Sequence, residues 1–376
     1  MSATIPAMVN AHSHAFQRAL RGRGERPSPD RDDDFWSWRT EMFRLAEALD
    51  PAGMRRAALE TYSEMVGAGY GVVGEFHYVH HQPDGTPYAE PNSMALAVAE
   101  AAVEAGLGIV LLPAAYHRGG WSPADGSDLP PAPGQRRFCD PDVDTFLARV
   151  DGLRSWAESV PGVSVGVAAH SVRAVPRDWL SVIAAYSERH GIVRHVHASE
   201  QRREIAECHA EHGCSPIQLL SETGFLGARA SVIHGIHVSS ADVALLAGSG
   251  STVVSCPTTE GNLGDGYLPG MAYAEAGVPL AIGSDSQVRI DPFEEARELE
   301  TGSRRERQLR SGLLAAVGDL WGELCRNGYR SLGLDDALTG ARTVEIDLEH
   351  PDLRGVSSED LPLALVTCAS AGVVAR

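Results

Sequence analysis

The sequence contains no lysine, so arginine supplies all 32 of its positively charged side chains. Without a lysine amino group the chain cannot form a Schiff base, complete a P-loop, or provide a carboxylated lysine that bridges two metal ions. A codon bias toward Arg, Ala and Gly would explain the absence. The three chemistries are excluded whatever its cause.

The sequence also lacks the features of membrane and secreted proteins. No run approaches the ~18 apolar residues of a membrane span, and Met1–Pro6 shows neither the basic nor the apolar region of a secretory signal. The six cysteines form no CxxC pair, which is typical of free thiols in a reducing compartment. We therefore expect a cytoplasmic protein without a membrane partner.

Positive charge is scarce relative to negative charge. The 32 basic residues face 50 acidic ones, and the net charge is −18. This balance argues against binding to nucleic acid, because that needs basic patches. With 376 residues, 43% of them hydrophobic and 22% charged, the composition is that of a globular protein. The length allows one large α/β barrel or two to three smaller domains.

One pattern recurs along the chain: a glycine, a short apolar run, and then an amphipathic helical stretch. Glycine suits the turn between a helix and the next strand. With a first strand near 7–11, the apolar runs lie at 7–11, 72–73, 109–112, 163–169, 192–196, 230–233, 252–255 and 279–282. Eight strands alternating with helices are typical of a (β/α)8 TIM-type barrel, although a doubly wound α/β sheet alternates in the same way.

A few segments can be assigned individually. Asp50 looks like the N-cap of a helix that has Pro51 in its first turn. The Gly- and Pro-rich segment Gly119–Gly134 is expected to be a long loop. Beyond the eighth strand, helices are expected at 292–300 and at roughly 304–325.

The strongest local motif is His12-Ser13-His14 at the end of the first predicted strand. Residues two apart in a strand point to the same side, so both imidazoles could reach one metal ion. An HxH motif alone is weak evidence. Its position strengthens it, because active sites of such barrels lie at the C-terminal ends of the strands.

Four further candidates end later strands: His170, His197, His234 and Asp285. Any one of them could be a structural residue, but five strands that each end in His or Asp are hard to explain that way. His12, His14, His197 and Asp285 would give three imidazoles and one carboxylate. This set suits Zn²⁺ or Fe²⁺ with an open position for a water molecule, whose pKa the metal can lower to about 7.

Glu200 follows His197 by three residues and could lean over the metal without binding it. The alternative is an acidic residue that interacts with the dipole of the next helix. Two other clusters compete as metal sites, at 77–81 (three histidines) and at 208–214 (two cysteines and two histidines). The second lies on a predicted helix and lacks the HExxH order.

The pattern of these residues resembles that of the amidohydrolase superfamily and, more narrowly, that of the formimidoylglutamate deiminase family of histidine degradation. The superfamily is indicated by the HxH motif with His197, His234 and Asp285. The narrower resemblance runs from about Ile5 to Leu299, and the strings that carry it are 10–19, 76–81, 134–138, 170–175, 260–266 and 283–286.

The resemblance implies a role for each matching residue. His12, His14, His197 and Asp285 would hold one zinc ion, with Fe²⁺ as the alternative. Asp285 would also take the proton from the attacking water, Glu200 would protonate the departing nitrogen, and His234 would polarise or orient the water. Gln17, Tyr78, His170 and Arg173 would bind a small substrate that carries a carboxylate. We also expect a homodimer.

The chain departs from the family pattern in two places. Only about nine residues precede the HxH strand and the tail after Leu334 is short, so most of the family's small β-sandwich is expected to be missing. We assign 1–345 to the barrel and 346–376 to a C-terminal tail, with 361–374 as a possible remnant of the sandwich. Gln287 stands where the family usually has histidine and is expected to touch the substrate.

Three functions remain open from the sequence. The first is hydrolysis of N-formimino-L-glutamate to N-formyl-L-glutamate and ammonia. The second is the same chemistry on another amidine, guanidine or aminated ring, by a specialised relative in a biosynthetic pathway. The third is a barrel that binds a carboxylate ligand without turnover.

Overall fold

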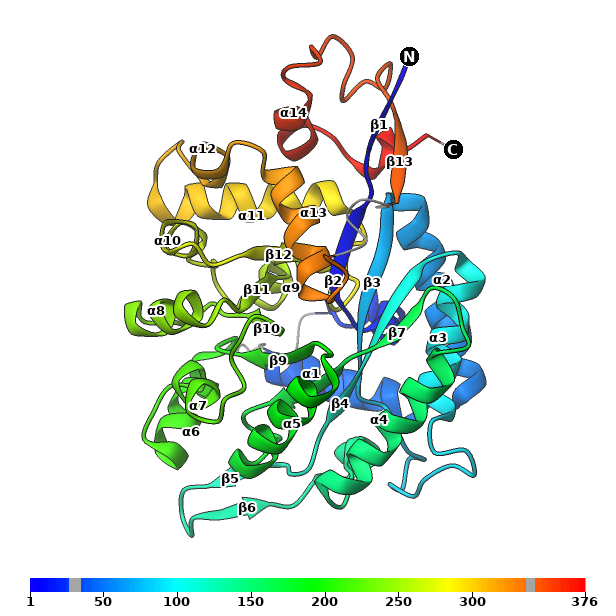
Figure 1. Cartoon of the computed structure of the whole chain (residues 1–376), viewed down its shortest axis with the longest axis vertical. Helices are drawn as coiled ribbons and strands as arrows, with labels where there is room; N and C mark the ends of the chain where they lie inside the picture. The colour runs from blue at the N-terminus through cyan, green and yellow to red at the C-terminus, as the bar shows by residue number, and fades with distance from the viewer. Residues whose placement is uncertain (27–34, 336–341, 376) are drawn as a thin grey trace.

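Eight parallel strands form the centre of the molecule (Figure 1). The computed structural model describes residues 1–26, 35–335 and 342–375. In sheet order the strands are β2 (Met8–Ser13), β3 (Tyr70–His77), β4 (Gly108–Ala115), β8 (Val167–Ser171), β9 (Arg194–Ala198), β10 (Ala230–His234), β11 (Thr252–Ser255) and β12 (Leu280–Ile282). A short strand, β7 (Val163–Val165), also pairs with β4. All eight predicted strands are present.

The barrel closes where β12 meets β2. Ser13 and Asp285 form a parallel bridge. The backbone N–H of His14 donates to the carbonyl of Asp285 (3.0 Å), and that of Asp285 donates to the carbonyl of His12 (3.1 Å). A Cβ on Gly283 would lie 2.6 Å from the His12 carbonyl oxygen, so only glycine permits this approach. The prediction of a (β/α)8 barrel is confirmed.

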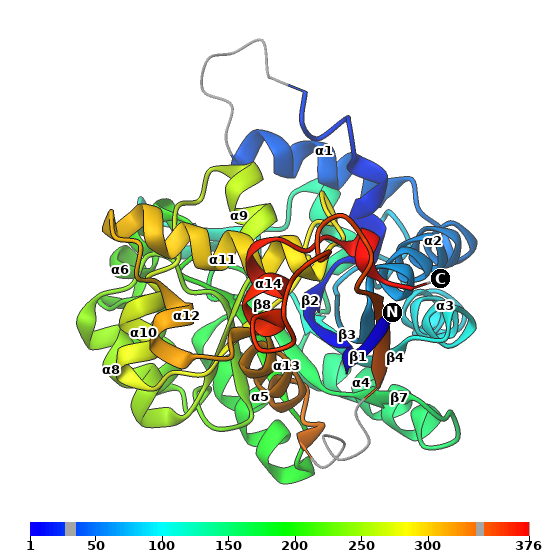
Figure 2. The ribbon, with the colours of Figure 1, turned by 90° about the horizontal axis from the view of Figure 1, so that it is seen from above.

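Helices surround the strands, as the view along the long axis shows (Figure 2). Asp50 caps α2 by accepting from the Gly53 N–H (2.6 Å), as predicted. The outer helices are α2 (Pro51–Ala68), α3 (Ser93–Ala105), α4 (Val143–Ala157), α5 (Arg177–His190), α6 (Arg202–His212), α7 (Pro216–Glu222), α8 (Ser240–Ser249), α9 (Pro257–Leu263), α10 (Gly270–Ala276), α11 (Pro292–Arg307), α12 (Leu313–Val317) and α13 (Leu320–Ser331). None of the described helices is long and apolar enough to cross a membrane.

Two predicted segments differ from the structure. The expected loop at 119–134 contains a hairpin of β5 (Gly120–Ser122) and β6 (Ser127–Leu129), closed by a turn in which Gly126 has φ +67°. The second expected helix, at 304–325, is instead divided among the end of α11, α12 and α13. Gly312 precedes α12 and Gly318 follows it, and neither residue supports a continuous helix.

A small apolar cluster fills the barrel below the strand ends. It consists of Ala11, Ile233, Val254, Cys256 and Ala281, all fully buried. Ala11 and Ile233 immediately precede His12 and His234. The side chains at the strand ends therefore pack on an apolar layer, which excludes water from one side of them.

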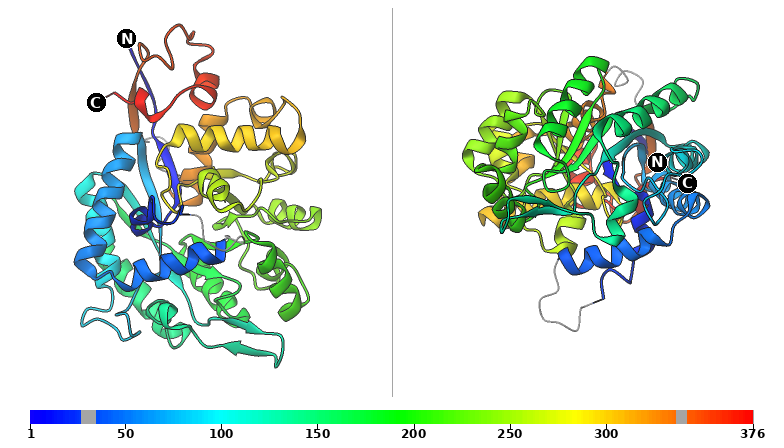
Figure 3. Two further views of the ribbon diagram at one scale, coloured as in Figure 1. Left: turned by 180° about the vertical axis from the view of Figure 1, so that it is seen from behind. Right: turned by 90° about the horizontal axis from the view of Figure 1, so that it is seen from below.

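Helix α1 (Phe35–Glu47) lies along one side of the barrel end at which the strands terminate (Figure 3). The opposite end carries an antiparallel pair of β1 (Ser2–Pro6) and β13 (Thr343–Asp347). Helix α14 (Leu361–Thr367) packs there against α11 and α13. The expected boundary between 345 and 346 lies within β13, and the segment 361–374 is mainly helical rather than a strand of a sandwich.

Candidate metal centre and active site

Three histidines and one aspartate meet where the barrel closes. The Nε2 atoms of His12 and His197 are 3.1 Å apart, and Asp285 Oδ1 lies 3.5 Å from Nε2 of both His12 and His14. The ligand atoms of the three histidines all lie within 4.8 Å of one another, and each residue is buried. The structure thus brings together the four residues expected to bind a metal.

The chemistry of this donor set fits a divalent metal ion. His14 and His197 each donate from Nδ1 to a backbone carbonyl, of Phe76 and of His170 respectively (both 2.7 Å). Their Nε2 lone pairs therefore face the cluster. Burial, together with neighbouring histidines, keeps the pKa of all three imidazoles well below the usual value, and that of His14 at about 3. Neutral imidazole is the form that binds metals.

His234 lies beside the cluster between three carboxylates. Its Nε2 is 3.5 Å from Glu200 and 3.9 Å from Asp285, and its Nδ1 donates to Glu260 (3.3 Å). Burial opposes protonation, but these carboxylates outweigh it and raise the pKa of His234 to about 10. These contacts favour the protonated form of His234, which can donate hydrogen bonds to the surrounding carboxylates.

The strand ends that carry these groups adopt an unusual backbone. Ser199, His234 and Asp285 have φ of +59°, +72° and +43°, in the left-handed region that non-glycine residues seldom occupy. Such conformations persist when surrounding structure enforces them, and they cluster at functional sites. Here the backbone of Asp285 is held by its two hydrogen bonds across the barrel seam.

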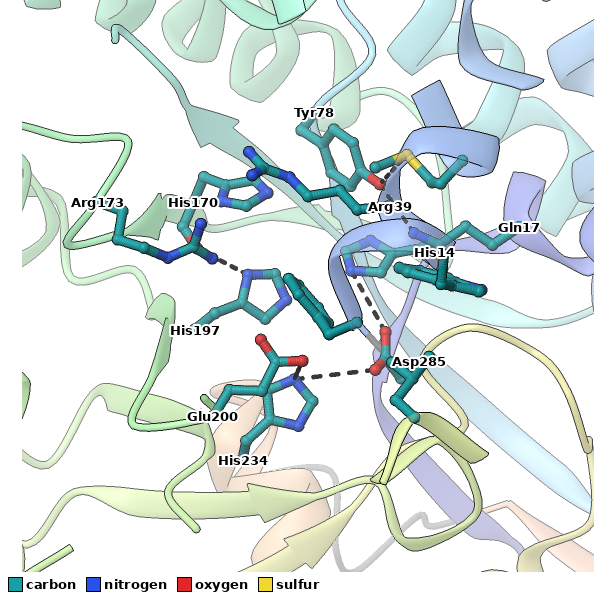
Figure 4. Close-up of a pocket in the computed structure, with 14 residues that line it drawn as sticks. His14, Gln17, Arg39, Tyr78, His170, Arg173, His197, Glu200, His234 and Asp285 are labelled. Atoms are coloured by element: carbon teal, nitrogen blue, oxygen red, sulfur yellow. Dashed lines mark hydrogen bonds and ion pairs between the residues drawn. The ribbon is translucent and has the colours of Figure 1, made fainter. Parts of the chain in front are cut away.

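A cavity opens between these residues and α1 (Figure 4). Of the residues singled out from the sequence, all except His12 and Gln287 line it. On the substrate side, Gln17 donates to the hydroxyl of Tyr78 (2.8 Å), and the His170 imidazole is kept neutral because burial and the nearby arginines lower its pKa. Arg173 reaches in from the loop after β8.

Sequence reasoning missed Arg39. This residue lies on α1, lines the cavity, and donates to the Tyr116 hydroxyl (3.0 Å). Burial lowers the pKa of Arg39, and the nearby guanidinium of Arg173 lowers it further. No strand-end rule could have found it. The available signal was an arginine on an amphipathic helix rich in tryptophan and phenylalanine.

Gln287 does not touch the cavity, which corrects the expectation that it contacts substrate. Its amide donates to Ser13 Oγ (3.0 Å) and to the backbone carbonyl of Asp285 (2.7 Å), and accepts from Ser284 Oγ (2.8 Å). The positive φ of Gln287 (+64°) belongs to a turn that directs its side chain into the barrel wall. The amide therefore supports the backbone beside Asp285 rather than lining the cavity.

Neither competing cluster forms a metal site. Among the described residues, only two groups bring at least three ligand atoms within 4.8 Å, and neither includes a residue of 77–81 or 208–214. The second group, His234 with Cys256 and Glu260, is the hydrogen-bonded support of His234. Glu260 also accepts from the Cys256 N–H (2.7 Å).

Glu75 of β3 lies against β2, and we predict that it makes the free energy of unfolding depend on pH. Its carboxylate accepts from Ser13 Oγ (2.6 Å) and from the Ala15 N–H (2.8 Å), but burial dominates and raises its pKa to about 8. The folded protein thus keeps a proton that the unfolded chain loses. From the unfolded pKa up to about 8, the free energy of unfolding should fall by at most about 1.4 kcal/mol per pH unit from this group.

A Glu75→Gln variant should flatten that part of the pH dependence, because the amide resembles the protonated acid and does not titrate. Urea unfolding at about pH 5 and about pH 8 would measure the slope. Glu207→Gln, at an exposed ion pair with Arg203, is the control. An unchanged slope in Glu75→Gln would show that Glu75 is ionised in the folded protein throughout this range.

Comparisons with known proteins agree on the family. A sequence profile of the amidohydrolase family matches residues 3–338. Formimidoylglutamate deiminase of Pseudomonas aeruginosa is 39% identical over 312 residues, which make up 83% of this chain and 67% of that protein. An isoxanthopterin deaminase from an unknown prokaryotic organism is 31% identical over 284 residues, covering 74% of this chain and 55% of that protein.

Solved structures share the fold. An amidohydrolase from Brucella melitensis superposes with a TM-score of 0.89 and 33% identity, over 99% of this chain and 84% of that one. A zinc-bound adenosine deaminase from Xanthomonas campestris has a TM-score of 0.80 and 22% identity, over 99% and 78%, a likeness of fold alone. Because the family profile spans most of the chain and the Pseudomonas enzyme shares well over a third of the aligned residues, this protein belongs to the amidohydrolase family, whose deiminases and deaminases hydrolyse C–N bonds.

Proposed function

We propose that this enzyme hydrolyses N-formimino-L-glutamate to N-formyl-L-glutamate and ammonia. The observation that carries the proposal is the pair Arg39 and Arg173, which face the cavity on the side away from Asp285 (Figure 4). Among the described residues, no carboxylate forms an ion pair with either guanidinium. Two guanidinium groups that form no ion pair with a described carboxylate favour a substrate with two carboxylates, because arginine binds carboxylate through a bidentate fork.

The proposed metal site would use His12, His14, His197 and Asp285 to hold one Zn²⁺ or Fe²⁺. Bound there, a divalent metal ion would supply a water molecule that ionises near neutral pH. The two oxygens of Asp285 point in different directions, since Oδ1 faces His12 and His14 whereas Oδ2 faces His234. This arrangement supports the proposal that Asp285 Oδ2 takes a proton from the attacking water.

Glu200 lies 3.5 Å from the same His234 Nε2 atom that Asp285 approaches, and it would act as the acid. In the reaction, the water oxygen bonds to the formimino carbon. The water loses both protons and the terminal =NH nitrogen gains two, with Asp285 as the first acceptor and Glu200 as the final donor, so that the bond from the carbon to this nitrogen breaks and ammonia leaves. One carboxylate must accept a proton and the other donate one, which requires different environments. Burial raises the pKa of Asp285 to about 7 in the metal-free protein.

A substrate panel tests the proposal. Zinc-loaded protein would be assayed for ammonia release from N-formimino-L-glutamate, N-formiminoglycine, a guanidino acid, an adenine nucleoside and a pterin. We expect N-formimino-L-glutamate to have the highest kcat/KM, above about 10⁴ M⁻¹s⁻¹. A higher kcat/KM for the nucleoside or pterin would replace the proposal with ring deamination. If no compound released ammonia, the result would favour the alternative of a barrel that binds a carboxylate ligand without turnover.

Arg173→Met should raise KM for N-formimino-L-glutamate. The loss of a charge-assisted bidentate contact is worth ~1.5–3 kcal/mol, or about ten- to a hundredfold in KM, with little change in kcat. Arg177→Met, which removes an exposed ion pair with Glu222, is a matched control. Unchanged KM in Arg173→Met would remove this residue from the substrate site.

N-formiminoglycine sharpens this test, because it lacks the side-chain carboxylate. If Arg39 and Arg173 each hold one carboxylate, KM for this compound should respond to Arg39→Met or to Arg173→Met, but not to both. An equal rise in both variants would mean that the two arginines share one carboxylate.

A further inference from the structure

The loop that carries Arg173 depends on a neighbouring segment for its position. It follows β8 and turns at Ser171, whose carbonyl accepts from the N–H groups of Ala174 and Val175. The Ala174 carbonyl in turn accepts from the backbone N–H groups of His117 (3.0 Å) and Arg118 (3.2 Å). The guanidinium of Arg173 lies 5.2 Å from the Trp36 ring and has no ion-pair partner among the described residues. The backbone of its loop therefore contributes to its location, together with the Trp36 ring.

The side chain of Arg118 forms hydrogen bonds with the backbone of this loop. Its Nε donates to the carbonyl of Arg173 (3.0 Å), and its Nη2 donates to the carbonyl of Val172 (3.3 Å). The remaining N–H groups bind two carboxylates: Glu211 of α6 accepts from both Nη atoms (2.7 and 2.8 Å), and Asp128 of β6 accepts from Nη1. Every N–H of the guanidinium is thus directed at an acceptor.

The guanidinium of Arg118 is enclosed by its partners. Arg118 is only 3% exposed and does not line the substrate cavity. Glu211 and Asp128 come from two different elements and hold the planar guanidinium from one side, while the two loop carbonyls bind the other N–H groups. A lysine ammonium could not satisfy four residues in this geometry.

We propose that Arg118 is a positioning residue that fixes the Arg173 loop and thereby sets the affinity for the substrate carboxylate. The inference rests on the proposed function, since it takes Arg173 as a carboxylate ligand. Arg118 does not touch the substrate or the metal cluster, so its effect belongs in binding rather than in the chemical step.

A double-mutant cycle on KM tests the proposal. Arg118→Met should raise KM for N-formimino-L-glutamate about tenfold, because a shift of about 1 Å in a binding group can be that costly, and should leave kcat within about threefold. In the Arg173→Met background, Arg118→Met should add little, because the group that it positions is gone. Fully additive effects, or a fall in kcat without a rise in KM, would overturn the proposal.

Amide hydrogen exchange gives a second readout that needs no substrate. The peptide spanning 171–175 should exchange faster in Arg118→Met than in wild type, while β9 and β10 keep their protection. Arg177→Met should leave the 171–175 peptide unchanged. If Arg118→Met fails to fold, Glu211→Gln takes its place, since it weakens the bidentate pair without removing the arginine. Unchanged exchange at 171–175 would refute the positioning role.

The two readouts separate the two hypotheses. Suppose that wild-type protein releases no ammonia from N-formimino-L-glutamate, but the 171–175 peptide exchanges faster in Arg118→Met. The proposed function is then wrong, and the restraint of the loop by Arg118 stands. The part of the inference that links Arg118 to binding of this substrate's carboxylate is refuted. If wild type is active and KM does not respond to Arg118→Met, the proposed function stands and this inference fails.

Discussion

Metal analysis of a His197→Ala variant should find less than about a tenth of the metal in wild-type protein, in which we expect about one Zn²⁺ or Fe²⁺ per chain. His197 donates from Nδ1 to the His170 carbonyl (2.7 Å), which leaves its Nε2 lone pair facing the cluster. Alanine leaves two imidazoles and one carboxylate, with no donor from β9. Ammonia release should disappear with the metal.

Thermal stability provides an independent measurement of the same loss. A ligand that binds only the folded state raises its stability, by about 4 kcal/mol at a thousand times Kd. Added zinc should therefore raise the melting temperature of chelator-treated wild type but not that of His197→Ala. His209→Ala, an exposed histidine on α6 within the competing cluster, should behave like wild type. Full metal retention by His197→Ala would exclude His197 as a ligand.

Glu200→Gln should lower kcat by roughly two to four orders of magnitude while the metal and the fold are retained. The amide has the shape of the acid but no proton to give to the departing nitrogen. Glu200 does not belong to the group of three histidine ligands, so metal content should remain at the wild-type level.

Glu207→Gln on the exposed face of α6 is the matched control for this substitution, and it should retain wild-type kcat. A Glu200→Gln enzyme as fast as wild type would assign proton donation to another group. Loss of metal from Glu200→Gln would instead make Glu200 a ligand. Either result would change the proposed division of roles between Glu200 and Asp285.

The residues at strand ends could be located from the sequence because a parallel barrel gathers those ends in one place. Once the strands were assigned, the order of His12, His14, His197, His234 and Asp285 along the chain was enough to predict that they meet. Their catalytic and ligand roles stay predictions, since proximity alone does not assign them. Periodicity could not divide α11, α12 and α13, because the breaks depend on local backbone conformations: the C-cap of α11 is Gln308 with φ +55°, and that of α12 is Gly318 with φ +76°.

Two errors concern residues outside the strands. Arg39 was missed because α1 reaches the cavity by tertiary packing, which no spacing in the sequence encodes. Gln287 was wrongly placed near substrate because distance along the chain was taken for distance in space. A left-handed backbone at Asp285 and Gln287 turns the Gln287 side chain into the wall, and a single sequence gives little sign of such a turn.

The seam between β2 and β12 has a consequence for the order of folding. Asn10 and Ser284, hydrogen-bonded across that seam, are 274 residues apart in the chain. The full set of proposed ligands exists only when the first and last strands of the barrel have met, so a growing chain that lacks Asp285 offers only the histidines. A metal ion held there would crosslink the first and last strands of the barrel and oppose their separation, as other long-range crosslinks do. Metal uptake would then report that the ring of strands is complete.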